Sequence, residues 1–163
     1  MSKKNEINDL ARMLGNQLMT HQLHCAVAES CTGGSLAAAI TEIPGSSQWF
    51  DCGFVTYSNG SKEALLGVPV DVLSVYGAVS QETACAMAEG VLAKSSATIA
   101  ASITGIAGPD GGSLHKPVGT VWVAWASRFH PTSASLYLFE GDRRAIREQS
   151  VIEALRGLIK LSR

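Results

Sequence analysis

Apolar residues follow two different spacings along this chain, and the two alternate. In some stretches they recur every three or four positions, the period of an amphipathic helix, and in others they form short continuous runs, as in buried strands. The pattern predicts helices over residues 5–21, 35–43, 59–67, 70–76, 80–93 and 143–161, and strands over 25–30, 52–58, 98–107, 118–127 and 133–141. Alternation of the two kinds of element indicates an α/β fold.

In the second half of the chain, two predicted strands follow one another without a helix between them. The strand predicted at 98–107 consists mostly of small and apolar residues, which is typical of a strand buried on both faces. The last two strands are separated only by a turn around Phe129-His130-Pro131, so we expect an antiparallel hairpin at one side of the sheet. The predicted fold class is therefore α/β, a three-layer α/β/α sandwich with a mixed central sheet. The chain contains no internal repeat or linker, so residues 1–163 are expected to form a single domain.

Composition narrows the partners that this domain can take. Hydrophobic residues make up 46% of the chain and charged residues 17%, which leaves room for a subunit interface, so we expect a homo-oligomer. The net charge of -1, without a basic block, argues against nucleic acid and anionic membranes as partners. No apolar run is long enough to cross a bilayer. A small-molecule partner fits better.

Cysteine and histidine spacing argues against a metal site and against disulfides. The four cysteines form no CxxC pair, and the four histidines have no ligand spacing with one another or with the cysteines. The N-terminal residues, MSKKNEINDL, lack the apolar core of a signal peptide. We therefore expect free thiols, no bound metal and a cytoplasmic location.

Polar residues interrupt the chain where the first predicted strand meets the second predicted helix. In an open α/β sheet, ligands bind outside the carboxyl ends of the strands, and Ser30 lies at such an end. The N–H groups around Thr32, Gly33 and Gly34 open a helix and are suited to a phosphate, a carboxylate or an oxyanion. The alternative is that Ser30 or Thr32 only caps the helix while the glycines turn the chain.

A lysine follows the next predicted strand at an unusual position. Tyr57 is expected to end that strand, Ser58 or Asn59 to cap a helix, and Lys62 to lie in the first turn of this helix. The positive end of the helix dipole and partial burial would both lower the pKa of Lys62, which would suit a general base. A serine paired with a neutral lysine is a known nucleophile and base. The alternative is a solvated surface lysine.

A glycine-rich loop separates the two central strands of the second half. The segment SITGIAGPDGGSLHKPVGTV has neither the order of a P-loop nor that of a GxGxxG fingerprint. A loop of this length between central strands is more often a binding loop than a plain turn. We expect Thr104, Gly105 and Gly108 to line the same cleft as Ser30.

Six motifs in order resemble the CinA C-terminal domain family. They are AESCTGG, GSSQWF, GFVTYSNGSK, GAVS, SITGIAGPDGG and KPVGTVW, which lie between residues 28 and 122, and the resemblance covers nearly the whole chain. The resemblance implies an α/β/α sandwich and, as in free-standing members of the family, a hydrolase that converts nicotinamide mononucleotide to nicotinate mononucleotide and ammonia. It also implies Ser30 as the nucleophile, Lys62 as its base and Tyr57 as a helper, with no cofactor.

Several assignments stay open beside this resemblance. The amides of residues 32–34 would bind either the oxyanion or the substrate phosphate. Arg143, in GDRRAIR, is expected to contact a phosphate or carboxylate, or else to pair with Asp142 or Glu140. Gly60-Ser61 departs from the family pattern because less flexible residues are expected before the lysine. The other functions to weigh are a non-catalytic nucleotide-binding or interaction module, and a serine amidase that acts on another small amide.

Overall fold

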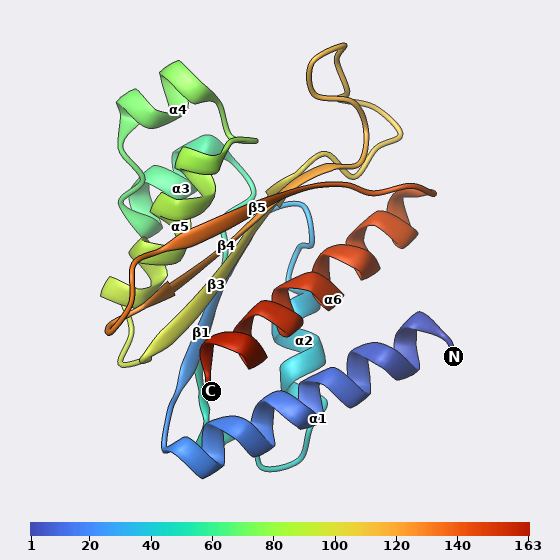
Figure 1. Ribbon diagram of the computed structural model, residues 1–163. Coiled ribbons are helices and arrows are strands. Elements are labelled where there is room, and N and C mark those ends of the chain that lie inside the picture. The colour runs from blue at the N-terminus through green and yellow to red at the C-terminus, as the bar shows by residue number, and fades with distance from the viewer.

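Short apolar strands form the centre of the protein. The computed structural model describes residues 1–163 and contains a five-stranded sheet in the order β2-β1-β3-β4-β5 (Figure 1). The strands are β1 (Cys25–Glu29), β2 (Phe50–Val55), β3 (Ile99–Gly105), β4 (Thr120–Ser127) and β5 (Ser133–Leu138). β1 pairs in parallel with both β2 and β3, whereas β3, β4 and β5 pair in antiparallel fashion. The sheet is therefore mixed, with the hairpin at one side, as the sequence predicts.

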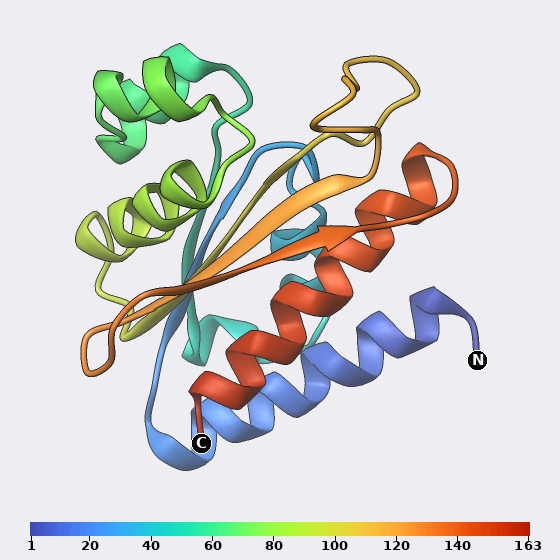
Figure 2. The same ribbon diagram turned by 45° about the horizontal axis from the view of Figure 1, so that its top comes forward.

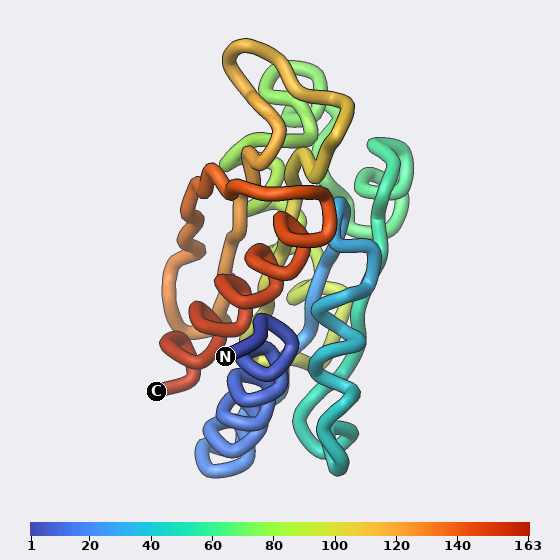
Figure 3. The backbone as a smooth tube through the Cα atoms, turned by 90° about the vertical axis from the view of Figure 1, so that its right-hand side faces the viewer, coloured from blue at the N-terminus to red at the C-terminus, as the bar shows by residue number.

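Helices cover both faces of this sheet (Figures 1 and 2). One layer contains α1 (Lys3–His21), α2 (Ser35–Thr41) and α6 (Arg143–Leu161), and the other contains α3 (Asn59–Leu66), α4 (Val70–Tyr76) and α5 (Gln81–Ala93). A short 3₁₀ helix, η1 (Ser46–Gln48), precedes β2. α1 and α6 pack side by side in the first layer (Figure 3), and α6 also packs directly on β3 and β4. The predicted α/β/α sandwich is confirmed.

The core consists of two apolar clusters, one on each face of the sheet. Because side chains alternate along a strand, Val27 of β1 faces the α1–α2–α6 layer and Ala26 faces the α5 layer. The α5 face of the sheet is built largely from alanine, whereas the opposite face carries larger aliphatic side chains. All five residues of β1 are buried, as expected for a central strand with helices on both sides.

Several predicted boundaries are wrong by one to three residues, and β2, for example, covers Phe50–Val55 rather than 52–58. β2 ends at Val55, so Tyr57 lies beyond the strand rather than at its end. After Val55 the backbone bonds with α3 instead of continuing the strand. The carbonyls of Thr56 and Tyr57 accept hydrogen bonds from the Lys62 side chain, and Ser58 caps the helix. None of the six α-helices is both long enough and apolar enough to span a membrane.

Candidate active site

The candidate nucleophile lies at the carboxyl end of the central strands. Ser30 directly follows β1, and its N–H donates to the carbonyl of Ile103 in β3 at 2.9 Å, which continues the sheet by one residue. On the other side, the N–H of Thr56 donates to the carbonyl of Glu29 at 2.8 Å. Ser30 is thereby held between two neighbouring strands, and only 8% of its surface is exposed.

The second element of the site is the start of α3. The side chain of Ser58 accepts a hydrogen bond from the N–H of Ser61, so Ser58 rather than Asn59 is the cap. In return, the Ser61 hydroxyl donates to the Ser58 carbonyl at 2.8 Å. This reciprocal pair starts the helix so that Lys62 points inward, and Lys62 is 1% exposed. The interpretation of Lys62 as a solvated surface lysine is therefore wrong.

The amine of Lys62 has three partners, all of which contain oxygen. Its Nζ lies 2.9 Å from Ser30 Oγ, 2.7 Å from the Thr56 carbonyl and 3.2 Å from the Tyr57 carbonyl. No carboxylate forms an ion pair with it. Burial therefore lowers the pKa of the Lys62 ammonium, because little in its surroundings compensates for the lost hydration of the charge.

This geometry directs the lone pair of a neutral Lys62 amine. A carbonyl oxygen can only accept hydrogen bonds, so the two carbonyls take the two N–H bonds of the neutral amine. The lone pair is left for the third partner, the hydroxyl of Ser30, which can donate its proton. In the neutral state, Lys62 is thus arranged to accept the proton of Ser30.

A cavity of about 240 Å³ opens beside Ser30. Its lining comes from the start of residues 30–34, which we call the nucleophile turn, from the segment after β2, from the loop after β3 and from the start of α6. The lining residues are Ser30, Cys31, Tyr57, Gly105, Ile106, Ala107, Gly108, Asp110, Gly111 and Arg143. The structure therefore brings together five of the residues singled out from the sequence, Ser30, Tyr57, Gly105, Gly108 and Arg143. Lys62 does not line the cavity itself, but its Nζ contacts Ser30 Oγ, which does.

Arg143 joins two walls of this cavity. Its Nη1 donates to the carbonyl of Gly108 at 2.7 Å and its Nη2 to the hydroxyl of Tyr57 at 3.2 Å. It forms no ion pair with Asp142, whose carboxylate instead caps α6 by accepting from the N–H of Ala145. The predicted pairing of Arg143 with Asp142 or Glu140 is therefore wrong.

Four of the predicted binding residues do not line the cavity. The side chain of Thr32 is fully buried, and that of Thr104 donates to the carbonyl of Ala78 instead. Gly33 and Gly34 have φ values of +57° and +101°, so they turn the chain away from the cavity toward α2. The N–H of Gly33 donates to the carbonyl of Ser30 within this turn.

Other backbone N–H groups at the cavity have no partner within the protein. Those of Cys31, Ala107, Gly108 and Gly111 donate no hydrogen bond to another residue. The N–H of the residue after a nucleophile is a common oxyanion donor in serine hydrolases. Cys31 and the loop after β3 therefore offer free N–H donors at the cavity, whereas residues 32–34 do not line it.

Two further residues of the site were missed in the sequence. The buried carboxylate of Glu29 accepts hydrogen bonds from the N–H groups of Leu36 and Ala37 at 2.8 and 3.0 Å, and so performs the capping role once considered for Ser30 or Thr32. Arg147 reaches the nucleophile turn from α6. Its spacing of four from Arg143 places both side chains on one face of a helix, a signal that was available in the sequence.

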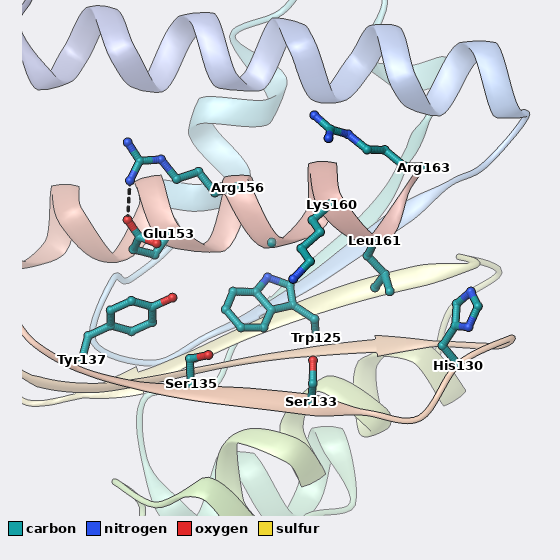
Figure 4. A pocket seen from close by; sticks show the side chains of 11 residues that line it. Trp125, His130, Ser133, Ser135, Tyr137, Glu153, Arg156, Lys160, Leu161 and Arg163 are labelled. Carbon is teal, nitrogen blue, oxygen red and sulfur yellow. Dashed lines mark hydrogen bonds and ion pairs between the residues drawn. The ribbon is translucent and has the colours of Figure 1, made fainter.

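A larger groove lies elsewhere, between α6 and the β4–β5 hairpin (Figure 4). Its volume is about 560 Å³, and its residues include Trp125, Ser133, Tyr137, Lys160 and Arg163. Serine hydroxyls line it, but none forms a hydrogen bond with a buried base, and it lies toward the other end of α6 from Arg143. We therefore assign the chemistry to the smaller cavity. No three His, Cys, Asp or Glu side chains cluster closely enough to hold a metal ion.

Comparison with known proteins shows to which family the chain belongs. The model of the CinA C-terminal domain matches residues 7–162. The chain belongs to this family. It is 51% identical over 155 residues to nicotinamide-nucleotide amidohydrolase PncC of Pseudomonas putida, covering 95% of this chain and 96% of that protein. The crystal structure of a competence/damage inducible protein from Agrobacterium tumefaciens superposes with a TM-score of 0.95 at 44% identity, covering 97% and 96% of the two chains.

The same domain also occurs in longer proteins. A CinA-like protein of Akkermansia muciniphila is 48% identical over 146 residues, which are 90% of this chain but 35% of that protein. The family resemblance carried by the six motifs is confirmed by these matches.

Proposed function

We propose that this protein hydrolyses the carboxamide of nicotinamide mononucleotide to nicotinate mononucleotide and ammonia, with Ser30 as the nucleophile and Lys62 as its base. The observation that carries the mechanism is the 2.9 Å contact between Ser30 Oγ and the Nζ of a buried lysine. The substrate is supported by the amidohydrolase named above, which matches this chain over almost its whole length.

The first step forms an ester on Ser30. Lys62 accepts the hydroxyl proton as Ser30 Oγ attacks the carboxamide carbon, and the carbonyl oxygen becomes an oxyanion. The free N–H groups of Cys31 and of the loop after β3 are the donors available to it. The protonated Lys62 then returns the proton to the amide nitrogen, the C–N bond breaks, and ammonia leaves.

The second step restores the enzyme. Water attacks the ester carbon, its proton passes to Lys62, and the released Ser30 oxygen takes that proton back. The net reaction consumes one water for each amide and needs no cofactor. Tyr57 and Arg143 are placed to bind the rest of the nucleotide, because Arg143 is a cation at the cavity wall and suits the phosphate. Tyr57 would help through its hydroxyl, which Arg143 orients.

The test is ammonia release from nicotinamide mononucleotide by the wild-type protein and by Ser30→Ala. We expect wild-type turnover, and a loss on the order of 10⁴-fold or more in the variant. The melting temperature should change little, because the variant loses one hydrogen bond, worth about 1 kcal/mol. Ser30→Ala that retains most of the rate would contradict the nucleophile assignment.

The same assay separates the alternative functions. Binding of the nucleotide without ammonia release would indicate a binding module, and ammonia release only from other amides in a substrate panel would indicate a different amidase.

A further inference from the structure

We propose that Arg147 is a positioning residue for this reaction, which holds the turn after Ser30 so that Ser30 Oγ stays in contact with Lys62. The proposal rests on the proposed function. Arg147 belongs to α6 and does not line the cavity. We expect it to act on turnover through the turn that it holds.

The contacts of Arg147 converge on one turn of the backbone. Its Nη2 donates to the carbonyl of Thr32 at 2.9 Å and to the hydroxyl of Ser35 at 3.1 Å. The Ser35 hydroxyl also donates to the Thr32 carbonyl, at 2.6 Å. Arg147 forms no ion pair with a carboxylate, so these oxygens are the partners of its charge. Hydrogen bonds from a charged donor are about twice as strong as neutral ones.

The nucleophile turn needs such a brace because of its own residues. Gly33 and Gly34 both adopt left-handed φ values, and glycine has a wide choice of other conformations. Gly34 stands at the N-cap position of α2 and offers no side chain to fix the helix start. The Glu29 carboxylate accepts hydrogen bonds from N–H groups in the first turn of α2, and Arg147 of α6 donates to the Thr32 carbonyl. The turn is thus clamped from two directions.

The position of Arg147 on α6 links the two walls of the site. Arg143, one turn earlier on the same helix, contacts Tyr57 and the Gly108 carbonyl. Arg147 contacts the nucleophile turn. One rigid helix therefore sets the spacing between Ser30 and the loops that line the rest of the cavity.

A positioning role predicts a specific kinetic change. If the turn relaxes by about 1 Å, the reaction is expected to slow about 10²-fold, since proton transfer from Ser30 to Lys62 depends on their contact. Substrate binding should change little, because Arg147 does not line the cavity. Loss of Arg147 should therefore lower kcat and leave KM within about twofold of wild type.

The experiment compares Arg147→Met, Arg147→Lys and the control Arg144→Met. Arg144 is a neighbour on α6 whose side chain is 82% exposed, and its removal should leave kcat unchanged. We expect Arg147→Met to lower kcat at least tenfold at unchanged KM, and Arg147→Lys, which keeps a cationic donor, to retain more of the rate. Assays run well below the melting temperature of each variant. Unchanged kcat in Arg147→Met, or a raised KM alone, would overturn the proposal.

A second readout keeps this test independent of the substrate. A fluorophosphonate probe reacts with an activated serine, so its rate of labelling at Ser30 should fall in Arg147→Met and persist in Arg144→Met. Labelled wild-type protein that releases no ammonia from nicotinamide mononucleotide would overturn the proposed function, while the labelling rates would still decide the role of Arg147. Wild-type protein that neither labels nor turns over would overturn both.

Discussion

At the residue scale, the chemistry of this protein depends on the surroundings of one amine. Lys62 is 1% exposed and bonds to two carbonyls and one hydroxyl, without a carboxylate partner. A carboxylate at this place would favour the ammonium and remove the base. Carbonyls, by contrast, fix the amine and leave its lone pair free for Ser30. Because its partners are uncharged carbonyl and hydroxyl groups, this lysine is suited to accept a proton.

The base role predicts how the rate responds to pH and to substitution. Burial lowers the pKa of Lys62 from its ordinary value of 10.5, and only the neutral amine accepts a proton, so kcat should rise with pH through an ionisation below 10.5. Lys62→Arg keeps the charge but does not deprotonate, so it should lose nearly as much activity as Lys62→Ala. Steady-state kinetics of the two variants across pH give the answer. An active Lys62→Arg variant would show that the charge, and not the base, is required.

At the element scale, helix packing gives glycines very different roles. Gly60 lies in the first turn of α3, and a Cβ added there would meet nothing within 4 Å. Gly157 lies in α6 against the indole of Trp125, and an added Cβ would overlap the ring. The first glycine only weakens its helix, whereas the second allows α6 to approach β4.

We therefore predict opposite effects for the same substitution at these two positions. Gly60→Ala should raise the free energy of unfolding by about 0.5–1 kcal/mol, since alanine favours the helix. Gly157→Ala should lower it by about 1–3 kcal/mol, since the buried indole must move. Urea denaturation of the two variants measures both changes. A stabilised Gly157→Ala variant would contradict the packing of α6 on Trp125, and an unstable Gly60→Ala variant would contradict the open surroundings of α3.

At the scale of the whole molecule, the fold buries the Lys62 amine, and this burial lowers the free energy of unfolding at pH values where the amine would be charged in water. Burying Lys62 lowers its pKa in the folded state below the value of 10.5 that it has when unfolded. Between these two pKa values the unfolded chain binds more protons than the folded protein. The free energy of unfolding must therefore rise with pH in that window.

This linkage can be measured against a variant without the amine. The free energy of unfolding of the wild-type protein, minus that of Lys62→Met, should increase as the pH rises from the lowered pKa of Lys62 toward its ordinary value of 10.5, by at most about 1.4 kcal/mol per pH unit. Urea denaturation of both proteins at several pH values gives the difference, and the subtraction removes the contribution of other groups. A difference that falls with rising pH would mean that the folded state stabilises the ammonium.

The sequence by itself determined the order and type of the elements and the fold class. Helical and strand spacing arise from contacts within a few residues, so they are written locally in the chain. The sequence also placed the cap of α3 at Ser58 or Asn59, and the structure shows that it is Ser58. The six motifs also pointed to Ser30 and Lys62 before any contact between them was known. The type and order of the elements follow from neighbouring residues, whereas the roles expected for Ser30 and Lys62 came from the resemblance to the family.

The tertiary structure decided which of several possible partners each polar group takes. Lys62 is buried rather than exposed, the Glu29 carboxylate accepts hydrogen bonds from the first turn of α2, and free N–H groups of Cys31 and of the loop after β3 lie at the cavity. The contact of Arg147 with Thr32 joins residues 115 positions apart. Such contacts depend on how α6 packs across the sheet, and no local pattern in the chain encodes that packing.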